Sequence, residues 1–102
     1  MFARVTTFSG YLRDLHPAIV VAREQIVPKL GQRHGFEGGM LLVDRVSRTG
    51  LAISLWKDEQ DLADSDDEER QLMKDAARAF EVTADVRNCE VLYSKPGAAP
   101  SA

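Results

Sequence analysis

The chain has 102 residues, of which 44% are hydrophobic and 28% charged, and its formal net charge is −3. These values are typical of one globular domain. An acidic chain without a basic stripe argues against a nucleic-acid partner, and no segment approaches the ~20 apolar residues that cross a bilayer. The single cysteine cannot form an intrachain disulfide, and no secretory signal is expected, so a cytoplasmic location is expected.

The period of the hydrophobic pattern changes along the chain in the order strand, helix, strand, strand, helix, strand. β-branched and aromatic residues dominate the first segment, and apolar residues then recur at spacings of three and four. The predicted elements are a strand over 2–8, a helix over 12–30, strands over 36–45 and 51–57, a helical region over 58–80 and a strand over 84–93.

Two positions predict irregular backbone. Pro28 lacks an N–H and crowds the carbonyl of Glu24, which predicts a kink or early fraying of the first helix. The pair Gly38–Gly39 predicts a bulge in the second strand or a close approach of another backbone.

The second helical region is expected in two pieces. Asp58 can cap a short helix over 59–63, and Ser65 opens a second helix with Glu68 at capping-box spacing. The acidic run 66–69 is interpreted as a solvated helix start that complements the helix dipole.

A βαββαβ chain packs both helices on one face of a four-stranded antiparallel sheet. Right-handed crossovers then give the strand order 4-1-3-2, an α+β fold of the ferredoxin-like type. The expected domain covers 1–94, and 95–102, with two prolines, reads as a flexible C-terminal tail.

Both faces of the predicted sheet carry apolar residues. In the third strand Leu51, Ile53 and Leu55 share one face, while Ala52 and Trp56 share the other. A sheet with one solvated face alternates apolar and polar residues, so this pattern favours a second copy of the chain that covers the free face. The alternative is a monomer that exposes a few apolar residues.

Four groups of segments carry a family resemblance: 1–7, 27–30 ahead of 35–38, 42–45 and 52–59. In the last of these a strand ends in Trp56 and acidic residues begin a helix. Over about residues 1–93, their order and spacing resemble the antibiotic-biosynthesis-monooxygenase-like (ABM) branch of the dimeric α+β barrel superfamily. The resemblance implies a homodimer whose two sheets close into one barrel, with a cavity between sheet and helices in each subunit.

That branch includes cofactor-free oxygenases acting on aromatic polyketide-like substrates, quinol oxygenases and haem-degrading enzymes. The haem-degrading site has an Asn on the first strand, a Trp ending the third and a His on the second helix. Trp56 matches the Trp, but Thr6 or Thr7 stands where the Asn would fall, and the helix over 65–80 has no histidine. Haem degradation is therefore not expected, and no cofactor is expected.

Trp56 is the first candidate site residue, because an indole can stack on a flat substrate and donate one N–H. Its alternative role is to fill the end of the core. Arg4 and Thr6 share one face of the first strand. Arg4 could hold an anionic or enolate oxygen, or it could pair with Glu90 or Asp44 across the sheet.

His34 precedes Gly35 in a loop and could act as an acid or a base, or simply be a surface histidine. Cys89 is interpreted as a small buried hydrophobic residue. The sequence has no HxH, HExxH or cysteine pair, so no metal site is expected.

Two functions follow from these residues and the resemblance. One is a cofactor-free oxygenase for a small aromatic or quinol-type substrate, with Trp56 in the wall of the site and Arg4, Thr6 and His34 as polar groups. The alternative is a non-catalytic dimeric module that binds a small apolar ligand or serves a stress-associated or regulatory role. RNA recognition would need paired exposed aromatic residues on the middle strands, which the third strand lacks before its terminal Trp.

Overall fold

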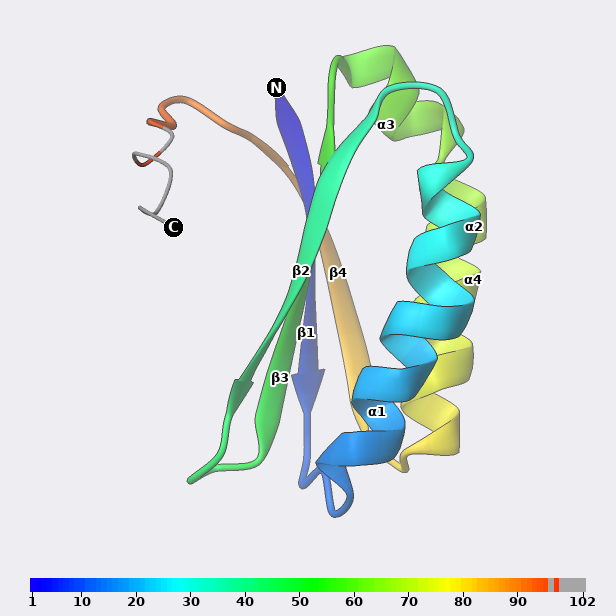
Figure 1. The fold of residues 1–102 in the computed structure, drawn as a ribbon, viewed down its shortest axis with the longest axis vertical. Helices are drawn as coiled ribbons and strands as arrows, with labels where there is room; N and C mark the ends of the chain where they lie inside the picture. Colours follow the sequence, from blue (N-terminus) through cyan, green and yellow to red (C-terminus); the bar gives the residue numbers. More distant parts are fainter. Residues whose placement is uncertain (96, 98–102) are drawn as a thin grey trace, which may run out of the picture.

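A computed structural model describes residues 1–95 and 97. Four antiparallel strands form one sheet, and all helices cover the same face of it (Figure 1). The elements are β1 (Phe2–Ser9), α1 (Leu15–Val21), η1 (Ala22–Ile26), α2 (Val27–Gly31), β2 (Phe36–Asp44), β3 (Thr49–Trp56), α3 (Glu59–Asp64), α4 (Asp66–Ala79) and β4 (Thr83–Glu90). The order β2-β3-β1-β4 confirms the predicted ferredoxin-like arrangement.

The predicted tail over 95–102 lies mostly outside the described residues, which include only Lys95 and Gly97 of it. In the described chain, no helix is both long and apolar enough to cross a membrane.

Strand register decides which side chains face the helices. Arg4 at the centre of β1 lies opposite Ser54 of β3 and Asn88 of β4, and Phe2 lies opposite Trp56. Directly opposed residues on neighbouring strands point to the same side of a sheet. Arg4, Ser54 and Trp56 are all buried, so this side is the one that the helices cover.

The glycine pair in β2 produces the predicted bulge. The register between β2 and β3 shifts between Phe36 and Gly38, and Gly38 has a φ of 150°, which residues with a side chain rarely adopt. The shift keeps Phe36 opposite Trp56 while the rest of β2 continues along β3.

The first helical region is continuous but changes its hydrogen-bonding pattern. It begins at Leu15, runs through the π-helical turn η1, in which the N–H of Val27 donates to the carbonyl of Ala22, and ends at Gly31. Of the kink or early fraying predicted at Pro28, fraying does not occur, because α2 continues through the proline. The predicted disturbance at Glu24 does occur, since this residue lies in the π-helical turn. The irregularity lies instead in the wider turn just before the proline, as is usual where a helix lacks a regular hydrogen bond.

Asp58 caps α3 as predicted, since its Oδ1 accepts the backbone N–H of Asp61 at 2.9 Å. The capping box predicted for Ser65 and Glu68 is wrong. Ser65 precedes α4, but its hydroxyl makes no capping bond and donates to the carbonyl oxygen of Leu62 at 2.8 Å. The hydroxyl is needed elsewhere, in the buried cluster described below.

The core lies between the sheet and the helices. Its buried apolar residues come from both helical regions and from β3: Ile26, Leu30, Trp56, Leu62, Met73 and Ala76.

None of the described helices lies on the opposite face of the sheet (Figure 1). Met40 and Leu42 of β2 are 53% and 44% exposed, and the larger apolar residues that face outward from β1 and β3 are half-buried: Val5, Leu51, Ile53 and Leu55. After β4 the chain leads away on this uncovered side, where Leu92 and Tyr93 are exposed. The uncovered face of the sheet thus exposes apolar side chains of β2.

Candidate ligand cavity

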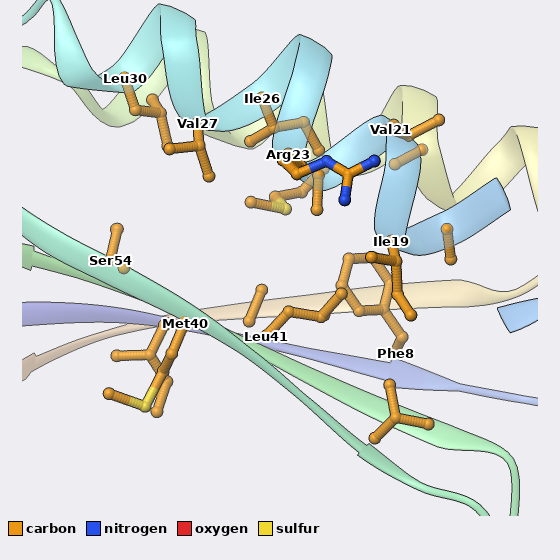
Figure 2. A pocket seen from close by; sticks show the side chains of 18 of the residues that line it. Phe8, Ile19, Val21, Arg23, Ile26, Val27, Leu30, Met40, Leu41 and Ser54 are labelled. Carbon is orange, nitrogen blue, oxygen red and sulfur yellow. The ribbon is translucent and has the colours of Figure 1, made fainter. Parts of the chain in front are cut away.

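A cavity of about 290 Å³ lies between the first helical region and the sheet (Figure 2). The sheet leaves space for the cavity because Gly39 and Ala52, which line it, place almost no side-chain volume on the covered face. Most of the wall is apolar, with contributions from Phe8, Ile26, Leu30, Leu41 and Met73. Cavities that bind small molecules have this character, with a few polar groups that fix orientation.

The polar members of the wall are Ser54, Glu69 and Arg23. Glu69 is 1% exposed, and the Ser54 hydroxyl lies 2.7 Å from its Oε1 and 2.8 Å from its Oε2. The indole N–H of Trp56 donates to the same hydroxyl at 2.8 Å. The Ser54 hydroxyl therefore accepts a hydrogen bond from Trp56 and donates its own O–H in a hydrogen bond to the carboxylate.

Behind Glu69 lies Arg4, which is completely buried. Its Nη1 donates to Glu69 Oε1 at 2.9 Å, and its Nη2 lies 3.2 Å from Asp66 Oδ1. The remaining donors of the guanidinium reach Ser65 Oγ at 2.8 Å, the carbonyl oxygen of Leu62 at 2.6 Å and Asn88 Oδ1 at 2.9 Å. A buried cation needs such complete pairing, because an unpaired charge away from water is very costly.

The predicted pairing of Arg4 with Glu90 or Asp44 is wrong. The actual partner, Glu69, reaches down from α4 rather than across the sheet. With its donors engaged in this way, Arg4 supports Glu69 from behind and is not among the residues that line the cavity.

Burial sets the protonation chemistry of this cluster. Burial raises the pKa of Glu69 above its ordinary value, although hydrogen bonds from Ser54 and Arg4 act in the opposite direction. Partial burial would raise the pKa of Asp66 too, but hydrogen bonds from Arg70 and Asn88 bring it below the usual value. The pKa values of the two carboxyl groups beside Arg4 are thus shifted in opposite directions, and Glu69 is the better proton acceptor.

Trp56 is fully buried and packs edge-on against Phe36, with ring centroids 5.4 Å apart. Phe36 lines the cavity, whereas the indole lies behind it. The structure thus places Trp56 in the core, one contact away from the cavity. The indole N–H of Trp56 is connected to the cavity only through its hydrogen bond to Ser54, which lines the cavity.

The other two predicted candidates do not line the cavity. Thr6 is fully buried, and its hydroxyl has no hydrogen-bond partner among the described residues. His34 is exposed, and its Nδ1 lies 2.9 Å from Asp61 Oδ1. That hydrogen bond raises the pKa of His34 above its ordinary value. Trp56 and Arg4 are therefore joined through Ser54 and Glu69, while His34 stands apart.

Glu69 was not among the predicted site residues, because the acidic run 66–69 was interpreted as a solvated helix start. A signal was present in the spacing of the residues. Glu69 lies four residues before Met73, which lies three before Ala76, so Glu69 continues the buried stripe of α4. Ser54 could be found in the same way, from its place between Ala52 and Trp56 in the alternation of β3.

Cys89 is exposed, so the prediction that it is buried is wrong. It points outward from β4, an edge strand, where neighbouring strands give little cover. In the described part of the chain, no three His, Cys, Asp or Glu side chains come together to hold a metal ion.

Solved structures with this architecture include several oxygenases. A single-site mutant of SnoaB, a cofactor-independent oxygenase from Streptomyces nogalater, matches with a TM-score of 0.72 and 18% identity over 94% of this chain and 97% of its own. A protein from Deinococcus radiodurans, named as an antibiotic biosynthesis monooxygenase, matches with a TM-score of 0.70 and 15% identity. The match covers 97% of this chain and 100% of the other. The chain shares the fold of these two proteins.

A third match is the monooxygenase ActVA-Orf6 of Streptomyces coelicolor in complex with nanaomycin D, with a TM-score of 0.66 and 14% identity over 98% and 92% of the two chains. No family model matches the sequence, and no curated protein matches it. The likeness to the ABM branch expected from the sequence is therefore confirmed as a likeness of fold.

Proposed function

We propose that the protein is a homodimeric, cofactor-free oxygenase that takes a small aromatic or quinol-type substrate into the cavity. The observation that carries this proposal is the cavity itself, which is apolar throughout except for a buried carboxylate, a hydroxyl and a rim arginine. Support comes from the fold, which the chain shares with a cofactor-independent oxygenase and with a monooxygenase solved with a bound ligand.

Oxygenation without a cofactor needs a substrate that becomes electron-rich enough to reduce O₂ directly. For an anthrone-type methylene the balance is CH₂ + O₂ → C=O + H₂O, through loss of a proton, bonding of O₂ to the carbanion carbon and loss of water from the peroxide. Apolar walls favour this path, because they exclude water that would compete for the reactive anion. The wall residues Phe8, Phe36 and Met73 suit a flat ring.

The homodimer forms through the uncovered face of the sheet. A solvated strand face usually carries polar residues, but Met40 and Leu42 are apolar and exposed. Ile53 and Leu55 beside them are only half-buried. A second sheet packed on this face would remove all four from water. We expect Leu42→Asp to convert a dimer, measured by light scattering, into a monomer. Val46→Asp, in the fully exposed hairpin turn, should leave the dimer intact, and a monomeric wild-type protein would refute this part of the proposal.

A cytoplasmic location belongs to the same proposal. Cys89 is an exposed free thiol, which suits a reducing compartment.

The test of the function is oxygen uptake by purified protein with anthrone-type and quinol substrates. Ala52→Phe puts a ring into the floor of the cavity, so uptake should fall to the uncatalysed rate. Ala79→Phe, the same change at an exposed position of α4, should keep the wild-type rate. Wild-type protein that consumes no oxygen with either substrate class would refute the enzymatic proposal.

A non-catalytic ligand-binding or regulatory module is the second candidate. It is favoured by the internal use of the Trp56 N–H and of the Arg4 donors, which leaves few groups to stabilise a substrate anion. Tight binding of aromatic molecules that Ala52→Phe abolishes, without oxygen uptake, would support this candidate.

A further inference from the structure

Glu69 is the buried carboxylate among the residues that line the cavity. Of the polar wall residues, Arg23 has a side chain that is 66% exposed on η1, where Figure 2 shows it on the helical side of the cavity. The Ser54 hydroxyl already donates its hydrogen bond to Glu69 and accepts one from the N–H of Trp56. A ligand buried between the helices and the sheet therefore meets one strong acceptor, the Glu69 carboxylate.

Counting hydrogen bonds shows that this acceptor is not saturated. A carboxylate has about four lone-pair sites. Arg4 occupies one on Oε1, and the single proton of Ser54 occupies one more on either oxygen. Among the described residues Oε2 has no other donor, so it keeps free acceptor capacity.

We propose that Glu69 is the general base of the cavity, and that it selects neutral aromatic molecules carrying one weakly acidic O–H or C–H group. This inference rests on the proposed function, and it names both the group that takes the substrate's proton and the substrate class.

The surroundings of Glu69 allow it to accept a proton. When Glu69 becomes neutral, Arg4 still faces the Asp66 carboxylate at 3.2 Å and keeps its bonds to Leu62 and Asn88. The cluster therefore never contains an unpaired buried cation, which would oppose the transfer. Burial also raises the pKa of Glu69, which makes it a stronger base than an exposed carboxylate.

In the proton-transfer step, the O–H or C–H bond of the ring system breaks and its electron pair stays on the substrate as a phenolate or carbanion. The proton forms an O–H bond at Glu69 Oε2. The neutral carboxyl then returns this proton to the peroxide that O₂, the oxidant, forms at the carbanion carbon. A substrate carrying its own carboxylate beside Glu69 would be rejected, because two like charges in an apolar site repel strongly.

The first test compares 2-naphthol with 2-methoxynaphthalene, which has the same rings but no acidic proton. Fluorescence titration of wild-type protein should give about tenfold tighter binding of 2-naphthol, since a hydrogen bond to a charged group is among the stronger kinds. Equal binding of the two molecules, or none of either, would overturn the inference, and this measurement needs no variant.

The second test uses Glu69→Gln, which keeps the shape and the bond to Arg4 but removes the base. We expect 2-methoxynaphthalene to bind within about twofold of wild type, the preference for 2-naphthol to disappear, and kcat for anthrone-dependent oxygen uptake to fall by about 10²-fold or more with little change in KM. Asp67→Asn makes the same charge change at an exposed position of α4 and should change none of these values.

The pH profile separates a base from a structural residue. Wild-type kcat should fall as pH drops through the pKa of Glu69, and Glu69→Gln should lack this limb. The charged groups near Glu69 are Arg4 on β1, Asp66 and Arg70 on α4 and Arg23 on η1. Of these groups Asp66 has a pKa below its usual range, so it titrates on the acid side of Glu69.

These measurements separate the two proposals. Wild-type oxygen uptake that Glu69→Gln leaves unchanged would overturn the role of Glu69 and keep the oxygenase. A 2-naphthol preference that Glu69→Gln abolishes, in a protein that takes up no oxygen, would support Glu69 as the acceptor and overturn the oxygenase.

Discussion

Two ion pairs of equal length show how much burial matters in this protein. Arg4 and Glu69 are 2.9 Å apart, and so are His34 and Asp61. Glu69 is 1% exposed beside a cavity, whereas the His34 side chain is 87% exposed on the surface. The sequence pattern indicated His34 as a possible acid or base and did not indicate Glu69, yet of the two only Glu69 lines the cavity.

Both pairs raise a pKa, but for different reasons. Burial is the main cause at Glu69, and the hydrogen bond to Asp61 is the main cause at His34. In the other pair only His34 is exposed, because Asp61 is itself 7% exposed. Water screens the His34 ring and competes for its hydrogen bond, so His34 contributes little to stability. Water cannot reach the buried pair of Arg4 and Glu69 to replace a lost partner. Removing one of the two residues is therefore strongly destabilising.

The largest effect is expected from Arg4→Met, which leaves the Glu69 carboxylate buried without its cation. Unfolding by urea should show a loss of about 3–5 kcal/mol at neutral pH. Arg23→Met, which removes an exposed arginine, should change stability by about 0.5 kcal/mol or less. A loss of similar size in both variants would mean that burial does not distinguish the two arginines.

A double variant sharpens this comparison. Arg4→Met combined with Glu69→Leu removes both charges, so it should be more stable than Arg4→Met alone. A further loss on adding Glu69→Leu would show that the carboxylate contributes to stability without Arg4.

An intermediate effect is expected from Trp56→Phe. This variant removes the N–H that donates to Ser54 and leaves space beside Phe36, so it should lower the free energy of unfolding by about 1–3 kcal/mol. Circular dichroism is the suitable probe, because Trp56 is the only tryptophan. An unchanged unfolding curve would argue against the buried position of this indole.

The smallest effect is expected at the surface pair. The pKa of His34, followed by NMR of its ring, should lie above 6.5 and fall toward that value in Asp61→Asn. Since the folded pKa is raised, the contribution of His34 to stability is present below its unfolded pKa and is lost as pH rises through the folded pKa. His34→Ala should therefore leave the melting temperature unchanged at about pH 8. A clear loss at that pH would show that His34 has a structural role beyond its charge.

The sequence predicted the architecture well because architecture depends on local signals. Alternation over 2–8 and 51–57, helical spacing over 12–30 and the rule for crossover handedness together give the observed strand order. Gly38–Gly39 predicted the bulge, and Asp58 predicted a helix cap, because both effects act within a few residues.

By itself the sequence determined the order of the elements, the two faces of the sheet and the likeness to the ABM fold. The tertiary structure alone decided that Glu69, unlike the exposed Asp67 of the same acidic run, is buried. It then pairs with Arg4, 65 positions away in the chain. It also decided that Trp56 donates inward to Ser54 and that small residues on β2 and β3 leave a cavity above them. The reason is physical: periodicity depends on neighbours along the chain, whereas burial, charge pairing and empty space depend on which distant segments the fold brings together.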